Sequence, residues 1–222
     1  MDRASSPDSF ADLTVRQFTE SLSSAEPVPG GGAASALAGA LGASLVAMVA
    51  SLSTGRPKYA AYETTLARCG DVGRSLASEF LRLADKDADA YAGYAAALKL
   101  PRETDAQREA RKAAIETAAR AASDAPWECV MACVALVNAA DALAGRSNVN
   151  AASDVLVAAL LGEAAARGAA ENVNINLPST GDESYNETMS RQLDEALHDI
   201  AAVAARTRET VLSGKVRDPE DE

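Results

Sequence analysis

A long uncharged stretch, Pro27–Gly55, restricts the fold of this chain more than any other feature. It is long enough to cross a bilayer. Between Ala33 and Ser53, however, alanine, glycine and serine predominate, and this favours a helix buried among other helices of a water-soluble bundle. The large apolar residues of the expected helix form one stripe: Leu37, Leu41, Leu45, Met48 and Leu52.

The composition of the whole chain also favours helices. Its 222 residues suit one domain with one core, and only 4% of them are aromatic. Alanine and leucine interspersed with Glu, Arg and Lys are typical helix formers. We therefore expect an all-α, multi-helix up-and-down bundle over residues 10–214. It would lie between a flexible N-terminus at 1–9 and an acidic tail at 215–222.

Charge and cysteine content exclude some classes of function. The net charge of −11 argues against nucleic acid as a partner, because such proteins present a basic face. Three cysteines without disulfide spacing indicate a reducing compartment. Met1–Phe10 lacks the apolar core of a secretion signal. We expect a cytoplasmic protein without a membrane partner.

Capping and breaking residues divide the chain into helices. Thr14 with Gln17, and Thr104 with Gln107, have the spacing of a capping box. Asp124 before Pro126 has the pattern of a cap followed by a first-turn proline. The first expected helix begins at Thr14. The next helices are expected to cover 33–53, 61–98, 104–122, 124–143 and 151–168 or beyond, and a last helix runs through 189–211. Asn172–Leu177 alternates like a strand and is read as a helix extension or an extended connection.

A carboxylate interrupts the apolar stripe of the third helix. At about 100° per residue, Asp87 shares the face of Leu83 and Tyr91, whereas Asp85 and Asp89 point nearer to solvent. Burial raises the pKa of a carboxyl group toward the range used for proton transfer at neutral pH. Asp87 is therefore the candidate catalytic group. The alternative is a structural aspartate bonded to a neighbouring helix or a backbone amide.

A glycine run precedes the uncharged helix. The run Pro29-Gly30-Gly31-Gly32 leaves free amides at its glycines and in the first helical turn, and these could hold an anion or a polar ring. The run lacks the lysine and hydroxyl residue of a nucleotide phosphate loop. The alternative is a tight turn that needs positive φ angles.

Two further groups are candidates for substrate binding. The first is a polar cluster that could form a wall for a ring rich in donors and acceptors: Asn148, Asn150, Ser153 and Asp154. In the alternative reading, Asn150 caps a helix and Asp154 complements its dipole. The second group, Arg56 and Lys58, could bind an anionic tail or be merely solvated.

No metal site is expected. His198, the only histidine, points off its apolar stripe, which argues against Ser-His or Cys-His catalysis. Cys129 and Cys133 lie one turn apart without further ligands and are better read as small buried residues.

The ordered set of motifs resembles the cyclodeaminase/cyclohydrolase family over roughly Leu13 to Val211. The motifs are Pro29-Gly30-Gly31-Gly32, Gly39-Ala40-Leu41-Gly42-Ala43, Thr54-Gly55-Arg56 with Lys58-Tyr59, Asp85-Lys86-Asp87-Ala88, Leu100-Pro101-Arg102, and Asn148 to Asp154 continuing to Asn172 and Asn176-Leu177. Trp127 stands where the family more often has leucine. We expect no attached formiminotransferase domain.

The resemblance implies an all-α homodimer that acts on a tetrahydrofolate derivative without another cofactor. It places the family's carboxylate at Asp87, with Asp85 as second choice, and the folate at the glycine run. The implied reaction is cyclodeamination of 5-formiminotetrahydrofolate or hydrolysis of 5,10-methenyltetrahydrofolate. A non-catalytic helical bundle that binds folate is the alternative from another class.

Overall fold

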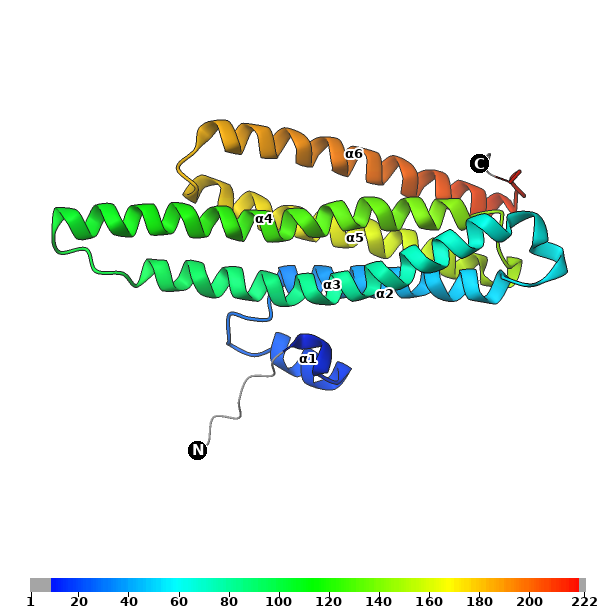
Figure 1. The fold of residues 1–222 in the computed structure, drawn as a ribbon, viewed down its shortest axis with the longest axis horizontal. Helices are drawn as coiled ribbons and strands as arrows, with labels where there is room; N and C mark the ends of the chain where they lie inside the picture. Colours follow the sequence, from blue (N-terminus) through cyan, green and yellow to red (C-terminus); the bar gives the residue numbers. More distant parts are fainter. Residues whose placement is uncertain (1–8, 220–222) are drawn as a thin grey trace.

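The computed structural model describes residues 9–219, and in this range the chain is helical without a strand. The expected flexible N-terminus at 1–9 lies outside the described residues except for Ser9. The α-helices are α1 (Val15–Leu22), α2 (Gly31–Ser53), α3 (Glu63–Leu98), α4 (Asp105–Leu143), α5 (Ala152–Asn176) and α6 (Glu183–Ser213) (Figure 1). Short 3-10 helices are η1 (Phe10–Asp12), η2 (Pro57–Tyr62), η3 (Val149–Ala151) and η4 (Leu177–Ser179). The predicted all-α bundle is confirmed.

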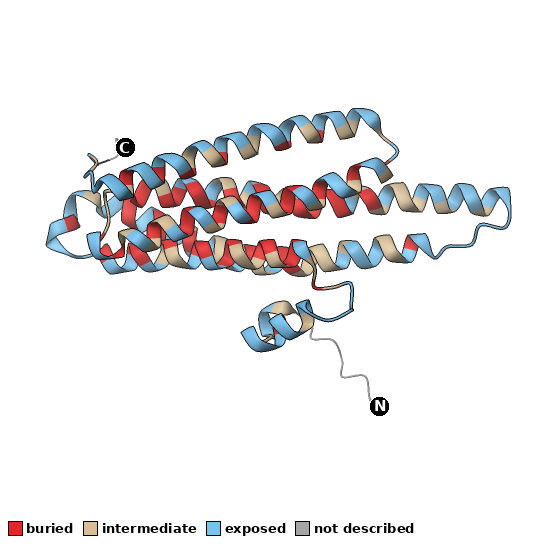
Figure 2. Ribbon diagram, turned by 180° about the vertical axis from the view of Figure 1, so that it is seen from behind, coloured by how far each residue is buried: buried red, intermediate tan, exposed pale blue. Residues whose placement is uncertain are grey.

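Four antiparallel helices form the body of the molecule. α2, α3, α4 and α5 follow one another up and down, and α6 lies along α4 and α5. The loop end of the α3–α4 pair extends past the other helices as a two-helix hairpin (Figure 1). Figure 2 shows that buried residues gather where the helices overlap and thin out along this hairpin. The short α1 stands off the bundle.

Both predicted capping boxes are present. The Thr14 hydroxyl accepts the amide of Gln17, and the Gln17 side chain accepts the amide of Thr14. Thr104 and Gln107 repeat this arrangement at the start of α4. Each box satisfies amides that the helix itself leaves free, which is why this spacing locates the helix starts correctly.

The expected break before Pro126 is wrong, because α4 runs unbroken from Asp105 to Leu143 with this proline inside. A proline within a helix leaves the carbonyl four residues earlier without its usual donor. That carbonyl, of Ala122, instead accepts a 2.9 Å hydrogen bond from Nδ2 of Asn176 on α5. A neighbouring helix thus replaces the bond that Pro126 cannot make.

The alternating segment Asn172–Leu177 continues α5 rather than forming an extended connection. Residues through Asn176 are helical, and η4 follows directly. The helix reading was the correct one of the two alternatives. The asparagines stabilise this end, since Asn172 Nδ2 donates to the Gly168 carbonyl and Asn176 Nδ2 also donates to that of Asn172.

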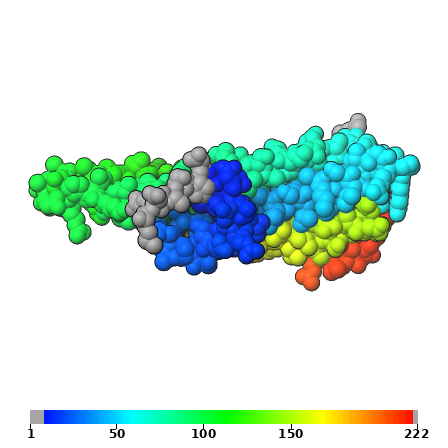
Figure 3. All heavy atoms as spheres, turned by 90° about the horizontal axis from the view of Figure 1, so that it is seen from below, coloured from blue at the N-terminus to red at the C-terminus, as the bar shows by residue number. Residues whose placement is uncertain are grey.

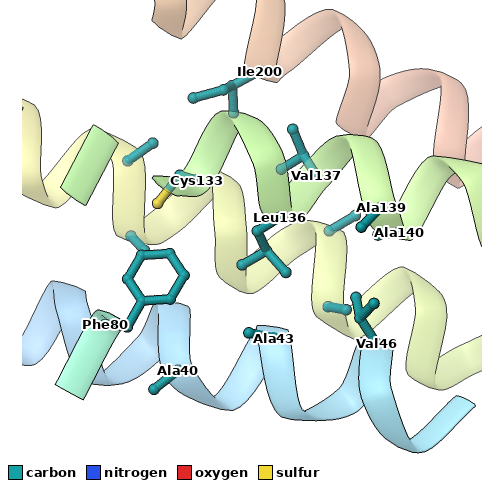
Figure 4. Packing of buried hydrophobic residues seen from close by; sticks show 14 of the residues in the cluster. Ala40, Ala43, Val46, Phe80, Cys133, Leu136, Val137, Ala139, Ala140 and Ile200 are labelled. Carbon is teal, nitrogen blue, oxygen red and sulfur yellow. The ribbon is translucent and has the colours of Figure 1, made fainter. Parts of the chain in front are cut away.

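The buried face of α2 is the small-residue face. Of the large residues in the expected stripe, Leu41, Met48 and Leu52 are exposed, whereas Leu37 and Leu45 are partly buried against the core. Inward-facing positions hold alanine, glycine and valine, and Ala40, Ala43 and Val46 lie opposite Phe80 of α3 and Leu136 of α4 (Figure 4). Small residues occupy the inner face because they let the helix backbones approach closely, whereas leucine side chains would keep the backbones apart.

Three helical stretches are long and apolar enough to cross a membrane by length and composition: Gly31–Ser53, Asp105–Leu143 and Val149–Ser179. In the structure all three belong to the same bundle and pack against one another. Their apolar surface is partly covered by neighbouring helices in this way.

The described end of the chain folds back onto the bundle. Arg217 donates to the backbone and side chain of Asp141 and to the Thr210 hydroxyl. Burial alone would raise the pKa of Asp141, but hydrogen bonds from Arg217 and Arg206 outweigh it and lower that pKa. Residues 215–218 therefore cover one end of the bundle.

Two glycines of α3 give a test of the close packing. A Cβ at Gly73 would lie 2.7 Å from the Ala47 nitrogen and 2.8 Å from the Ala43 oxygen, both backbone atoms of α2. We expect Gly73→Ala to destabilise the protein by about 1–3 kcal/mol, because a backbone cannot yield as a side chain can. The matched change Gly93→Ala, which meets nothing within 4 Å, should instead stabilise it by about 0.5–1 kcal/mol. Urea unfolding of both variants measures the difference, and equal stabilities would contradict the packing described.

Candidate active site

Asp87 lies where the four-helix packing gives way to the α3–α4 hairpin. One turn before it, Leu83 is fully buried, and one turn after it, Tyr91 is exposed. Asp87 itself is half-buried. The helical spacing placed Leu83 on the buried face correctly, but it did not show that this face is exposed by Tyr91. The apolar stripe thus leaves the core at the carboxylate, which gives the group both a low-polarity environment and access from outside.

The Asp87 carboxylate faces the first turn of α2. A Cβ at position 32 would overlap both carboxylate oxygens, so a larger residue there would displace the Asp87 side chain. Gly30 caps α2 without a side-chain hydrogen bond, and the first amides of a helix have no partner within it. The glycine run is therefore the surface against which Asp87 packs, with Pro29 buried behind it.

Two opposing effects act on the pKa of Asp87. Among the described residues, none makes a hydrogen bond or ion pair to its side chain, and burial raises its pKa. The partial positive charge at the start of α2 favours the ionised form. Opposed influences of this kind suit a group that has to accept and release a proton.

Asp85, the second choice, has a different environment. The Ser9 hydroxyl donates to its Oδ2 over 2.6 Å, and the amide of Phe10 donates to its Oδ1 over 2.8 Å. Both oxygens thus bind the segment that leads into η1. Asp85 is half-buried under this segment and not near solvent as expected. Its contacts suit an anchor for the N-terminal segment, which leaves Asp87 as the candidate for proton transfer.

Asn172 of α5 is a candidate that the sequence reading did not single out as a site residue. Its Nδ2 lies 3.6 Å from the position of a Cβ on Gly31, so its amide borders the start of α2. The same nitrogen donates to the Gly168 carbonyl, which orients the side chain. In the helical alternative for this segment, the spacing of Asn172 and Asn176, four residues apart, places both on one helical face, which is the signal that could have singled them out.

The polar cluster at the start of α5 lies at the opposite end of α2. The amide of Asn148 donates to the hydroxyl of Ser53, the last residue of α2, over 2.8 Å. Asn148 is buried, and its Oδ1 accepts the amide of Asn150, so Asn148 rather than Asn150 is the cap. Asn148 holds the loop against α2, and its polar groups are engaged in doing so.

The other members of this cluster point outward. Asn150 and Ser153 are exposed and Asp154 is half-buried, and none of their side chains has a hydrogen-bond partner among residues 9–219. Asp154 lies in the first turn of α5, as the dipole reading expected. Arg56 and Lys58 are also exposed at this end, with Lys58 Nζ 5.5 Å from the ring centre of Tyr59. These groups are available to a ligand.

A cavity of about 200 Å³ opens at the same end. Its wall combines apolar groups with Lys58, Tyr59, Ser147 and Lys215. Asp87 and the glycine run do not line it. Within one chain, therefore, the best enclosed space and the best candidate for proton transfer are in different places.

The predicted site residues thus form two groups. The first contains Asp87 and the residues 29–32, and the second contains Arg56, Lys58 and the cluster 148–154. The length of α2 separates them, and its 23 residues span about 33 Å at 1.5 Å per residue. The structure brings together the members of each group but not the two groups.

The remaining reactive side chains lie away from both groups. His198 is exposed on α6, and Cys129 and Cys133 are buried without a disulfide. Burial and the contact between the two thiols raise the pKa of Cys133, which keeps it unreactive. Across the part of the chain that the structure describes, no group of three or more His, Cys, Asp or Glu could hold a metal ion.

Comparison with known proteins identifies the family. The family model described as formiminotransferase-cyclodeaminase matches residues 14–195. Methenyltetrahydrofolate cyclohydrolase of Methylorubrum extorquens is 34% identical over 200 residues, covering 90% of this chain and 96% of that protein. Formimidoyltransferase-cyclodeaminase of Rattus norvegicus is 31% identical, and the match covers 89% of this chain but only 36% of that longer protein.

A solved structure agrees with these matches. Formiminotetrahydrofolate cyclodeaminase of Thermotoga maritima superposes with a TM-score of 0.83 at 26% identity, over 91% of this chain and 98% of that one. The resemblance drawn from the ordered motifs is therefore confirmed. The chain belongs to the formiminotransferase-cyclodeaminase family.

Proposed function

We propose that this protein hydrolyses 5,10-methenyltetrahydrofolate to 10-formyltetrahydrofolate, with Asp87 as the group that moves the proton. The observation that carries the proposal is the half-buried Asp87 carboxylate, which faces the start of α2 without a hydrogen-bond or ion-pair partner among residues 9–219. The substrate class follows from the family. The free-standing cyclohydrolase of Methylorubrum extorquens matches this chain along nearly its whole length.

The reaction needs one group that both removes and supplies a proton. The substrate carries a positive charge over N5, the bridging carbon and N10. The ionised Asp87 stabilises this charge and takes a proton from the water that attacks the bridging carbon. The protonated Asp87 then gives its proton to N5 as the bond between that carbon and N5 breaks. The hydroxyl proton of the intermediate passes to solvent as the formyl carbon–oxygen double bond forms, which gives the N10-formyl compound and regenerates the carboxylate.

Cyclodeamination is the second candidate, favoured by the likeness to the Thermotoga maritima enzyme of that name. In this reaction N10 attacks the formimino carbon of 5-formiminotetrahydrofolate. Asp87 takes the proton that N10 loses and gives it to the imino nitrogen, which gains one further proton from solvent. The bond from the carbon to that nitrogen then breaks, and ammonia leaves. Both reactions use the same carboxylate beside the same charged bridge.

The proposed folate site uses the first group of residues. The amides at Gly30, Gly31 and Gly32 and the Asn172 side chain would hold the polar pterin ring, and Pro29 would shape the entrance. Proton transfer and addition of water require no metal or redox cofactor. We further propose that the protein works in the cytoplasm as a homodimer.

The decisive experiment compares two substrates. Purified protein is mixed separately with 5,10-methenyltetrahydrofolate and with 5-formiminotetrahydrofolate, and the methenyl absorbance is followed against an uncatalysed control. We expect the band to disappear faster than the control in the first mixture. Growth of the band in the second mixture would establish cyclodeamination instead. If the protein binds folate but turns over neither substrate, the result would favour a non-catalytic helical bundle that binds folate.

Replacement of the carboxylate tests its role. We expect Asp87→Asn to fold normally and to lose about 10²–10⁴-fold in kcat, the usual contribution of a general acid–base group. Asp89→Asn is the matched control, since Asp89 is exposed on the same helix, and its kcat should stay unchanged. A fully active Asp87→Asn enzyme would eliminate this carboxylate as the proton-transfer group.

The raised pKa of Asp87 also predicts a change in stability. Burial favours the protonated form in the folded state, so stability falls as pH rises from the ordinary carboxyl range through the raised pKa. We therefore expect Asp87→Asn to unfold at a higher temperature than the wild type at neutral pH. The gain should vanish in acid, where Asp87 is protonated in both states. Thermal unfolding of both proteins across this pH range measures the difference in unfolding temperature. A variant less stable than the wild type at neutral pH would refute the claim that burial of the ionised Asp87 destabilises the fold.

A further inference from the structure

The proposed reaction leaves one cavity of the bundle unused. This end cavity, of about 200 Å³, lies between η2, the loop from α4 to α5, the start of α5 and the end of α6. Figure 3 shows these parts of the chain, in cyan, yellow-green and red, together at the end of the molecule opposite the α3–α4 hairpin. Asp87 and the glycine run do not line it, so within one chain the end cavity is separate from the candidate for proton transfer.

The described end of the chain forms one wall of the end cavity. Gly214 has a φ of 65° and turns the chain out of α6, and residues 214–216 then line the cavity. The amide of Arg217 donates to the Gly145 carbonyl over 3.2 Å. A Cβ at Gly145 would overlap the carbonyl oxygen of Lys215, so the glycine makes room for this segment. The wall is therefore held in place by bonds to the bundle.

Hydroxyl groups of the wall are already bonded within the protein. The Tyr59 hydroxyl accepts an amide of η3 over 3.2 Å, and the Tyr62 hydroxyl donates to the Arg217 carbonyl over 3.0 Å. The Ser147 hydroxyl donates to the Leu143 carbonyl over 2.9 Å. Apolar side chains make up most of the remaining wall: Ala144, Val149, Ala152, Val155, Val211 and Val216. The interior therefore suits an apolar group.

The charged groups of the wall have one sign. Among the described residues that line the end cavity, Lys58 and Lys215 carry charge and none is acidic. Both are exposed, and neither ammonium group has a carboxylate partner among residues 9–219. The chain as a whole has a net charge of −11, so the end cavity is positive on a negative molecule. Its charge favours an anion.

We propose that the end cavity binds a small organic anion, a carboxylate attached to one aromatic ring or a short hydrocarbon chain. The apolar wall holds the body of the ligand, and Lys58 and Lys215 bind the carboxylate at the exposed edge. An apolar cavity of about 150 Å³ holds one benzene molecule, so the end cavity has room for one substituted ring. Pockets for drug-sized molecules measure about 300–1,000 Å³, so a whole tetrahydrofolate exceeds it.

This site uses a part of the chain outside the family match. The family model matches residues 14–195, whereas Thr210, Val211 and residues 214–216 of the wall lie beyond it. The end cavity is therefore a property of this C-terminal segment and not only of the matched region. Its ligand also takes no part in the proposed reaction, so the inference does not rest on the proposed function.

Binding of 3-phenylpropionate to the full-length protein tests the site without turnover. We expect calorimetric titration to show saturable binding. The neutral 3-phenylpropanamide, which lacks the charge, and acetate, which lacks the ring, should each bind about tenfold more weakly or less. The carboxylate should also raise the unfolding temperature, because it binds the folded state. Absence of 3-phenylpropionate binding, or equal affinity for the amide, would overturn the proposal.

Removal of the lysine charges tests the anion-binding edge. We expect Lys58→Gln/Lys215→Gln to weaken 3-phenylpropionate binding about tenfold, since each exposed ion pair contributes only modestly, and to leave binding of the amide unchanged. Lys99→Gln/Lys112→Gln is the matched control, because it removes the same charge from exposed positions on the hairpin. This control should bind 3-phenylpropionate like the wild type. Equal weakening in both double variants would show an effect of net charge and refute the assigned edge.

Filling the cavity tests the apolar part of the site. Ala152→Leu keeps both lysines and places three more carbon atoms into the space that Ala152 lines. We expect this variant to unfold at the wild-type temperature or above and to lose detectable binding of 3-phenylpropionate. A folded Ala152→Leu protein that binds the probe like the wild type would contradict the assigned cavity.

Competition distinguishes the end cavity from the folate site. We expect 5,10-methenyltetrahydrofolate not to displace 3-phenylpropionate, and Asp87→Asn to bind the probe like the wild type. Displacement by the folate would place the probe in the folate site and overturn a separate ligand site. A wild-type protein that turns over neither folate substrate but binds the probe as described would refute only the proposed reaction.

Discussion

The rest of the structure depends on how closely the helices can approach α2. Its inner face consists of glycine, alanine, serine and valine, so the neighbouring backbones come nearly into contact, as Gly73 of α3 does with Ala43 and Ala47. A close-packed interior of this kind gains its stability from many small dispersion contacts rather than from a few large side chains. The larger side chains of the bundle, such as Phe80 and Leu136, come from the other helices and lie against this small-residue surface.

The same constraint shapes the candidate site. The Asp87 carboxylate lies where a Cβ at position 32 would be, so the glycine there makes room for the carboxylate in its present position. The carboxylate gains no hydrogen bond from the described residues in return, and its burial works against folding. A protein that keeps such a group sacrifices stability for reactivity, which is common where function is located.

Much of the fold could be predicted from local patterns, because caps and helical faces are set by neighbours in sequence. Thr14, Thr104 and the position of Asp87 on its helix are examples. The errors arose where a distant residue decides the outcome. Asn176 donates to the carbonyl that Pro126 leaves free in α4, and the packing of the bundle leaves Leu41, Met48 and Leu52 of α2 exposed. The members of each candidate group were also predictable, but the distance between the groups was not, since only the fold shows that α2 separates them.

The contact between Gly39 and Phe80 has a consequence for the history of this fold. A Cβ at Gly39 would lie within 2.6 Å of the Phe80 ring, so neither position can gain volume alone. Divergence at this point has to proceed in compensating pairs, with the ring shrinking as the glycine grows. Relatives that carry alanine in place of this glycine should therefore carry a smaller side chain in place of the phenylalanine. The two positions would then covary although they belong to different helices.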